Sequence, residues 1–435
     1  MSAWRMPSET APQDRVWMAF PTGGYTLGET AAEAHAARSV WAAVANAVVE
    51  FEPVTMLVAL ADVQTAADYL HPDIEVVPAA LNDAWMRDIG PTFVLDDGGR
   101  LGAVDWVFNG WGGQDWAAWD KDALVASAVA ARSGASHLVS PLVNEGGGIH
   151  VDGEGTVLVT ETVQLDPGRN PGLSKADVEA ELGRTLGVSH VVWLPRGLTR
   201  DSERFGTRGH VDIVAAIPSP GTVLVHSQQN PAHPDFEVCR DIISHLATTR
   251  DAAGREWNII EVPAPETLTD EEGFVDYSYI NHLVVNGGVI ACTFGDPMDE
   301  KALRILGDAY PGRRVVGIDA RELFARGGGI HCITQQQPSV PQKKVSNESD
   351  YRPRRRHHHA RRRRSGRFQA RHLGQGAQGR PAGPARRRRP RHLLRGTRLQ
   401  PDQFAGTRRR RRGPAAAGDL HCRVHPNDPG GVRLP

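Results

Sequence analysis

Short apolar runs alternate with polar turns along residues 1–338. Residues 16–20, VWMAF, form an apolar run that ends at a proline and a Gly-Gly turn, which indicates a buried strand. Residues 30–50 are rich in alanine, with apolar side chains at helical spacing, and predict an amphipathic helix. A strand at 54–60, a short helix at 62–70 and a strand at 74–77 are expected next.

One unit then recurs: two strands joined by a tight turn, a linking segment and a helix. The predicted hairpins span 92–107, 148–165, 211–226 and 279–294, and the helices that follow them cover 119–133, a segment from residue 174, 235–247 and 299–307. The pentapeptide Gly-Gly-Gly-Ile-His occurs twice, at 146–150 and 327–331. Repeated ββαβ units predict an α/β ring, like a propeller, whose loop ends surround a central pit.

Four glycine-marked segments carry side chains that could take part in catalysis. They are WMRDIGP with Asp88, NEGGG with Glu145, TRGHVD with His210 and Asp212, and GGGIHC with Cys332. If residue 211 begins a strand, the histidine and aspartate of the third segment lie on one face. Taken singly, the first segment is better explained by a structural ion pair with a capped turn, and the cysteine by a buried thiol, which is what most free cysteines are. The other two segments are weak signals on their own, and the histidine could simply be satisfied by a neighbouring carboxylate. Together, a thiol, a histidine and several carboxylates favour nucleophilic thiol chemistry on a cationic group.

Charge divides the chain in two. The net charge of −1 hides 27 basic and 5 acidic residues in 339–435, which leaves 23 basic and 46 acidic residues in 1–338. An acidic body favours small cationic ligands over nucleic acid. The four cysteines form no CxxC pair and show no zinc-finger spacing, a pattern that is typical of proteins in a reducing cytoplasm. We also expect no secretory signal and no membrane-spanning run of apolar residues.

The motifs WMRDIGP, NEGGGIH, TRGHVD, SYINHLVVNGG and GGGIHCITQQQP, in this order, closely resemble the agmatine deiminases and their bacterial peptidylarginine-deiminase relatives. The resemblance covers nearly all of 1–338. It implies the pentein fold, an α/β propeller of five ββαβ units with pseudo-fivefold symmetry and the site in its central channel. It also implies a hydrolase that converts agmatine to N-carbamoylputrescine and ammonia in polyamine synthesis, with no metal and no cofactor.

The resemblance also implies a role for each candidate residue. Asp88 and Asp212 would clamp the guanidinium by charge-assisted hydrogen bonds, and Cys332 would attack its carbon to form a thiouronium adduct. His210 would protonate the departing ammonia and then activate water, and Glu145 would orient or charge that histidine.

Two tryptophans, Trp85 and Trp111, are candidates to wall the aliphatic part of the substrate, although a packing role is equally consistent with the sequence. His150 and His331 are expected to be structural. Phe205-Gly206 stands where the family often has an acidic residue, which leaves the group that meets the far end of the substrate open. A small guanidine is therefore the expected partner, with agmatine the first choice, and a homo-oligomer is left open.

Three other functions stay open at this point. They are a deiminase acting on peptidylarginine, an amidinotransferase, and a protein that binds guanidines without catalysis. Ammonia release without an amine acceptor would speak against the amidinotransferase.

After residue 338 the composition changes abruptly to arginine, proline, glycine and alanine. Such a segment is typical of a disordered polycation able to bind nucleic acid, and equally of a GC-rich coding sequence translated in the wrong frame. We favour the second interpretation and expect the catalytic domain to span 1–338, with 339–435 a low-complexity tail. An intact mass of the protein from its host would distinguish the two.

Overall fold

A computed structural model describes residues 3–341, whose strands form five sheets of three or four strands. The sheets comprise β1 (Trp4–Arg5), β5 (Thr92–Asp96), β6 (Leu101–Val107) and β7 (Ser136–Val143); β8 (His150–Val151), β9 (Thr156–Thr160) and β10 (His190–Leu194); β11 (Ala215–Ser219), β12 (Thr222–Ser227) and β13 (Asn258–Pro263); β14 (Leu283–Val285), β15 (Gly288–Thr293) and β16 (Arg314–Asp319); and β17 (Thr334–Pro338), β2 (Gln13–Ala19), β3 (Val54–Ala59) and β4 (Glu75–Ala79).

One pairing pattern recurs in all five sheets. A central strand pairs antiparallel with one neighbour and parallel with the other, as β12 does with β11 and with β13. The same order holds for β5-β6-β7, β8-β9-β10, β14-β15-β16 and β17-β2-β3. Because parallel neighbours need a crossover connection, a helix lies between the second and third strand of each unit. These observations confirm the predicted ββαβ units and bring their number to five.

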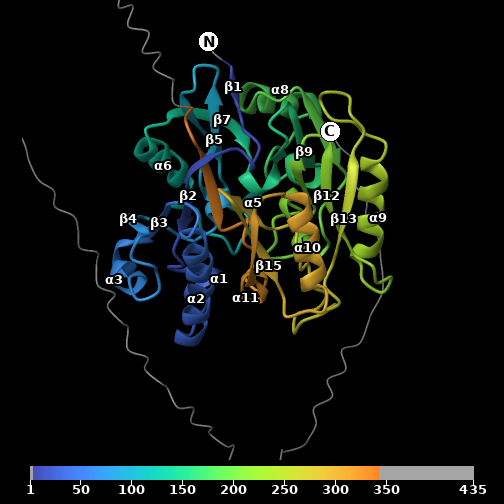
Figure 1. Ribbon diagram of the computed structural model, residues 1–435. Helices are drawn as coiled ribbons and strands as arrows, with labels where there is room; N and C mark the ends of the chain where they lie inside the picture. The colour runs from blue at the N-terminus through green and yellow to red at the C-terminus, as the bar shows by residue number, and fades with distance from the viewer. Residues whose placement is uncertain (1–2, 342–435) are drawn as a thin grey trace, which may run out of the picture. The chain divides into compact units, whose positions relative to one another are not determined.

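The connecting helices are amphipathic and carry clear end signals. They are α2 (Ala31–Val48), α6 (Val125–Ser133), α8 (Lys175–Leu186), α9 (Asp235–Leu246) and α10 (Asp299–Ala309). Capping boxes start α2 at Thr30 with Glu33 and α8 at Ser174 with Asp177, where each pair satisfies backbone groups at the helix start. Figure 1 shows α6, α8 and α9 outside the group of sheets.

Shorter helical segments occupy the linkers. The α-helical ones are α1 (Gly24–Leu27), α3 (Val63–Ala66), α4 (Met86–Ile89), α5 (Gly110–Gly113), α7 (Glu161–Gln164) and α11 (Arg321–Phe324). The 3-10 turns are η1 (Leu60–Asp62), η2 (Asp122–Leu124), η3 (Gly146–Gly148), η4 (Arg200–Ser202) and η5 (Val211–Ile213).

The fifth unit is built from both ends of the described chain. Strand β17 pairs antiparallel with β2, placing Gln336 opposite Val16, and the Trp17 indole donates a hydrogen bond of 2.9 Å to Gln337. Residues 16–19 of β2 and residues 54–58 of β3 are buried, which is why these stretches are mostly apolar. The last strand therefore anchors the loop that carries Cys332 to β2, near the start of the chain.

Most predicted elements are confirmed, although bounds shift by a few residues, as where the strand predicted from residue 279 begins at Leu283. Three others differ in type or extent. The segment from residue 211 forms the turn η5 instead of a strand, since the first strand of that unit begins at Ala215. The helix predicted at 119–133 begins as η2 and becomes α6 at Val125. The helix predicted at 62–70 is confined to η1 and α3.

Among residues 3–341, no helix is long and apolar enough to cross a bilayer. All but the first three residues of the segment predicted as a low-complexity tail lie outside the described residues.

Candidate active site

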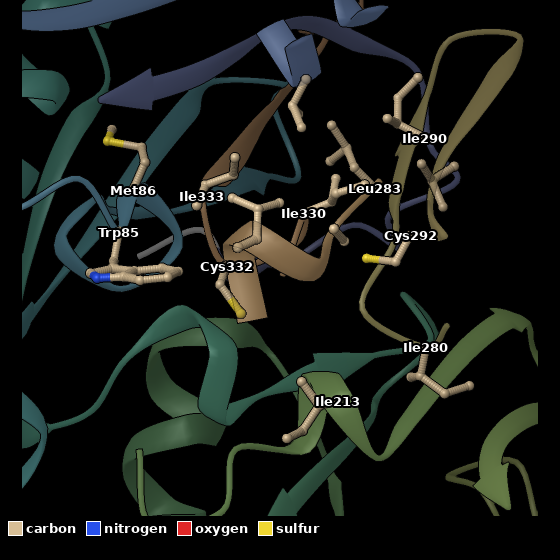
Figure 2. Packing of buried hydrophobic residues seen from close by; sticks show 14 of the residues in the cluster. Trp85, Met86, Ile213, Ile280, Leu283, Ile290, Cys292, Ile330, Cys332 and Ile333 are labelled. Carbon is tan, nitrogen blue, oxygen red and sulfur yellow. The ribbon is translucent and has the colours of Figure 1, made fainter. Parts of the chain in front are cut away.

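Cys332 lies in the loop between α11 and β17, at the edge of a buried apolar cluster. In Figure 2 its sulfur points away from Ile333 and toward the segment that carries Ile213, with Trp85 nearby. A Cβ atom added to Gly328 would lie 2.8 Å from the Trp85 ring and 3.0 Å from the cysteine sulfur. A side chain at Gly328 would therefore separate the indole from the thiol, so this close packing requires glycine.

The thiol has two polar neighbours. The Asn281 side-chain amide donates to the Cys332 sulfur at 3.2 Å, and the thiol itself lies 3.4 Å from Asp212 Oδ2. Burial, together with the charges of Asp212 and Asp88, raises the pKa of the Cys332 thiol well above its ordinary value. These surroundings favour the protonated form of the thiol.

Asp88 belongs to the short helix α4 and is held from two sides. The Trp111 indole donates to Asp88 Oδ2 at 2.9 Å, and the Gly147 amide donates to Asp88 Oδ1 at 3.1 Å. Burial raises the pKa of Asp88 to about 6, although the charge of His210 acts to lower it. This carboxylate is consequently oriented by neutral donors.

His210 is buried between two carboxylates. Its Nε2 lies 3.2 Å from Glu145 Oε2, and its Nδ1 lies 3.9 Å from Asp88 Oδ1. Burial acts to lower the pKa of His210, but Asp88 and Glu145 outweigh it and raise that pKa to about 9. At neutral pH the imidazole is therefore a cation with a proton to give.

Glu145 is wholly buried and paired with Arg169. The Arg169 Nε lies 3.0 Å from both carboxylate oxygens, and another guanidinium nitrogen donates to the Thr207 carbonyl at 2.7 Å. Burial acts to raise the pKa of Glu145, but Arg169 and His210 outweigh it and hold that pKa below its ordinary value. The Glu145 carboxylate is thus a fixed anion behind the histidine.

Asp212 lies in η5, directly after His210 and Val211. Its Oδ2 is 2.9 Å from His331 Nδ1, whereas its Oδ1 is buried and has no hydrogen-bond partner in the described part of the chain. His210 Nδ1 is also buried and has no hydrogen-bond partner among residues 3–341, since Asp88 Oδ1 is 3.9 Å away. Since buried polar atoms are nearly always satisfied, the two atoms indicate a place for a polar ligand.

These side chains converge on the backbone of Gly147. A Cβ atom at this position would lie 2.5 Å from His210 Nδ1, 3.0 Å from Asp88 Oδ1 and 3.1 Å from Asp212 Oδ2. Cys332 joins the group through its contact with Asp212. The structure thus brings the five candidate catalytic residues of the sequence analysis together, with Glu145 reaching the group through His210.

The two candidate tryptophans differ in their surroundings. Trp85 donates from its indole to Thr26 at 3.0 Å and packs edge-on against Trp41. Trp111 stacks on Trp116, with ring centroids 5.3 Å apart, and both line a cavity of about 740 Å³. His210, Asp88 and Asp212 do not line this cavity. Trp111 does, and its indole connects the cavity to the site through the hydrogen bond to Asp88.

Three residues with close contacts in this site were missed by sequence reasoning: Arg169, Asn281 and Asp201. Asp201 Oδ2 accepts from the backbone amides of Gly209 and His210, which fixes the loop that presents the histidine. Asn281 lies within the motif SYINHLVVNGG, so the sequence indicated the importance of this segment but not the role of the asparagine. No local pattern marks Arg169, because its partner Glu145 is 24 residues away.

Comparisons with known proteins identify the family of this chain. A model of the Porphyromonas-type peptidyl-arginine deiminase family matches residues 5–338. A relative from Streptomyces coelicolor is 57% identical over 336 residues, which are 77% of this chain and 99% of that protein. The agmatine deiminase of Pseudomonas syringae pv. tomato is 42% identical over 361 residues, covering 77% of this chain and 96% of its own length.

Among solved structures, the agmatine deiminase of Enterococcus faecalis aligns with a TM-score of 0.73 and 35% identity, over 78% of this chain and 97% of that chain. These matches confirm the resemblance and the fold class inferred from the sequence. The chain belongs to the Porphyromonas-type peptidyl-arginine deiminase family.

Proposed function

We propose that this protein hydrolyses the guanidinium group of agmatine, giving N-carbamoylputrescine and ammonia through a covalent intermediate on Cys332. The observation that carries the proposal is the meeting of Asp88, His210 and Asp212 around Gly147, with the thiol beside them. The names of the Pseudomonas and Enterococcus relatives support agmatine as the substrate.

Binding uses the two aspartates. A guanidinium is a planar cation whose N–H groups match carboxylate oxygens in pairs. Asp88 Oδ1 and the unpaired Asp212 Oδ1 accept from it. The neutral ureido product loses the charge that strengthens these bonds, so product binds more weakly than substrate.

In the first chemical step, the bound cation stabilises the thiolate of Cys332, whose own proton has left for solvent. The sulfur attacks the guanidinium carbon and forms a neutral tetrahedral adduct. His210 donates its proton to one amino group, which departs as ammonia with the C–N bonding pair. The product of this step is a cationic thiouronium attached to the enzyme, next to a neutral histidine.

In the second step, neutral His210 takes a proton from water while the hydroxide adds to the thiouronium carbon. The C–S bond then breaks, the thiolate leaves, and the carbonyl product loses its extra proton. Over both steps a guanidinium and a water become a urea and an ammonium ion. Glu145, fixed by Arg169, stabilises the histidine each time it is charged.

The burial of the site favours a free guanidine over a protein-bound arginine. Asp88, Glu145, His210, Asp212 and Cys332 are each at most 6% exposed. A peptide backbone flanking an arginine would have to enter the same space. The proposed enzyme therefore acts on a small, free substrate, and we place it in the cytoplasm because its cysteines show no disulfide pattern.

A guanidine panel tests the proposal. Purified protein is incubated with agmatine, arginine, a peptidylarginine and methylguanidine, and ammonia and ureido product are quantified without added amine. We expect agmatine to be the best substrate, with both products in equal amounts. Cys332→Ala is the paired control, and wild-type turnover by that variant would refute the covalent mechanism. Product that appears only with an amine acceptor would favour an amidinotransferase.

A further inference from the structure

A buried carboxylate from the start of the chain reaches the site through His331. Glu9 precedes β2, and its Oε1 lies 2.8 Å from His331 Nε2. The opposite ring nitrogen, Nδ1, lies 2.9 Å from Asp212 Oδ2. Glu9, His331 and Asp212 thus form a continuous chain that ends at the Cys332 thiol, 3.4 Å from the aspartate.

Both contacts of His331 require a proton on the imidazole. A carboxylate only accepts hydrogen bonds, whereas a neutral imidazole has a single N–H to donate. With a carboxylate oxygen against each nitrogen, both bonds form only if the ring is the imidazolium. The geometry alone therefore favours a permanent cation between two anions.

Two other titratable groups, Arg87 and His150, lie near His331 and Glu9. The Arg87 guanidinium of α4 lies 3.6 Å from Glu9 Oε1, and the ring of His150, from β8, has its centroid 6.4 Å from that of His331. Burial and Arg87 act to lower the pKa of His331, but Glu9 and Asp212 outweigh them and raise it. Burial acts to raise the pKa of Glu9, yet His331, His150 and Arg87 hold it well below its ordinary value.

Glu9, His150 and His331 also lie close enough together to suggest a metal site. Two contacts argue against it: the 2.8 Å hydrogen bond between Glu9 and His331, and the Arg87 cation beside the same glutamate oxygen. A metal ion there would displace that bond and lie next to a guanidinium. A hydrogen-bonded pair accounts for the cluster better.

We propose that Glu9 and His331 are positioning residues that orient Asp212 and keep the Glu9–His331–Asp212 group at a net charge of −1 for the bound guanidinium. This inference rests on the proposed function. Neither residue touches the reacting atoms, so their effect appears in substrate binding. The charge of His331 fixes Asp212, and the charge of Glu9 prevents that cation from repelling the substrate.

Glu9→Gln separates these two effects. The variant removes one negative charge and leaves a hydrogen-bonding amide of nearly equal size. While His331 is protonated, the group carries no net charge and binds a cation poorly. Once His331 loses its proton, the net charge of −1 returns. KM for agmatine is therefore expected to be raised about tenfold at the acid end and to fall toward the wild-type value as pH rises, since one nearby charge changes such equilibria by about that factor.

The experiment measures KM and kcat for agmatine between pH 6 and 9. Glu9→Gln is compared with the wild-type protein, with Glu9→Asp, which keeps the charge, and with Glu52→Gln. Glu52 is a matched control because it is also buried and accepts a backbone hydrogen bond, of 2.7 Å from Asn286, away from the site. The extra pH dependence of KM is expected in Glu9→Gln alone, with little change in kcat. The same KM profile in Glu9→Gln and the wild-type protein would overturn the proposal.

A second readout does not depend on the substrate. In protein labelled with ¹⁵N-histidine, the His331 signal is identified by its loss in His331→Asn. Both ring nitrogens should be protonated from pH 6 to 8 in the wild-type protein, and the signal should titrate in Glu9→Gln. A neutral His331 in the folded wild-type protein would refute the proposed ion pair between Glu9 and His331. If the wild-type protein releases no ammonia, the proposed function fails, and this titration still decides whether Glu9 maintains the charge of His331.

Discussion

The substitution Gly147→Ala, which adds a single methyl group, tests the site most directly. This residue has no left-handed backbone angle, so alanine fits its backbone conformation without strain. The new Cβ atom, however, would lie 2.5 Å from His210 Nδ1 and within 3.1 Å of Asp88 and Asp212. The substitution therefore displaces the groups that are proposed to bind and protonate the substrate.

The size of the effect follows from these distances. Ordinary van der Waals contact begins near 3.4 Å, so the histidine ring has to retreat by roughly 1 Å. A displacement of that size at reacting groups costs about 100-fold in rate. Overpacking of a buried position typically destabilises a protein by about 1–3 kcal/mol. We expect Gly147→Ala to remain folded and to lose about 100-fold in kcat/KM for agmatine.

The assay pairs ammonia release with urea denaturation monitored by circular dichroism. Gly307→Ala is the matched control, because Gly307 lies in α10 and its added Cβ would meet Val315 at 3.7 Å, an ordinary contact. Helix propensity predicts that this control is stabilised by up to about 1 kcal/mol, with unchanged turnover. A folded Gly147→Ala protein with wild-type kcat/KM would show that His210, Asp88 and Asp212 do not act at this point.

Three further outcomes follow from the same geometry. The plot of kcat/KM against pH should be bell-shaped: activity falls below about pH 6, where Asp88 is protonated and no longer binds the cation, and above about pH 9, where His210 has no proton to donate. Cys332→Ala should lose turnover but still bind agmatine, as measured by calorimetry. Arg169→Met should lower the free energy of unfolding by about 3–5 kcal/mol, because it removes the cation that contacts both oxygens of the buried Glu145 carboxylate and leaves His210 as its remaining charged partner.

Each of these outcomes has its own control. A flat pH profile between 5 and 10 would contradict the assigned protonation states. Cys239→Ala removes a buried thiol in α9 and should keep wild-type turnover. Arg304→Met breaks an exposed ion pair with Glu300 and should change stability by no more than about 1 kcal/mol. If the two arginine variants lowered the free energy of unfolding equally, burial of the Arg169–Glu145 ion pair would not increase its contribution to stability.

The repeated unit could be predicted from the sequence because its signals are local. A hairpin turn, two apolar strands and an amphipathic helix all lie within a few tens of residues, as for β11, β12 and α9. The predicted strand at residue 211 was wrong, because the alternation of apolar and polar residues did not reveal the turn η5. His210 and Asp212 nevertheless both reach Gly147, since the turn bends the backbone around it.

Partners that are distant in the sequence could not be predicted in this way. Glu9 and His331 are 322 residues apart, and their contact depends on tertiary structure that no local pattern encodes. His331 was expected to be structural, and the structure places it against Asp212. The duplicated Gly-Gly-Gly-Ile-His indicated related places in two units, and the rings of His150 and His331 do face the same region, with centroids 6.4 Å apart.

The pattern of charges around the site explains why an acidic body suits a cationic substrate. Glu145 has its own cation in Arg169, and Asp212 has its own in His331, each in direct hydrogen-bond contact. Among residues 3–341, the hydrogen-bond donors to Asp88 are the neutral Trp111 indole and Gly147 amide, and burial raises the pKa of Asp88 to about 6. A bound guanidinium adds a direct cationic partner for this carboxylate, which His210 approaches only to 3.9 Å. The same positive charge stabilises the Cys332 thiolate, so binding of the substrate also activates the nucleophile.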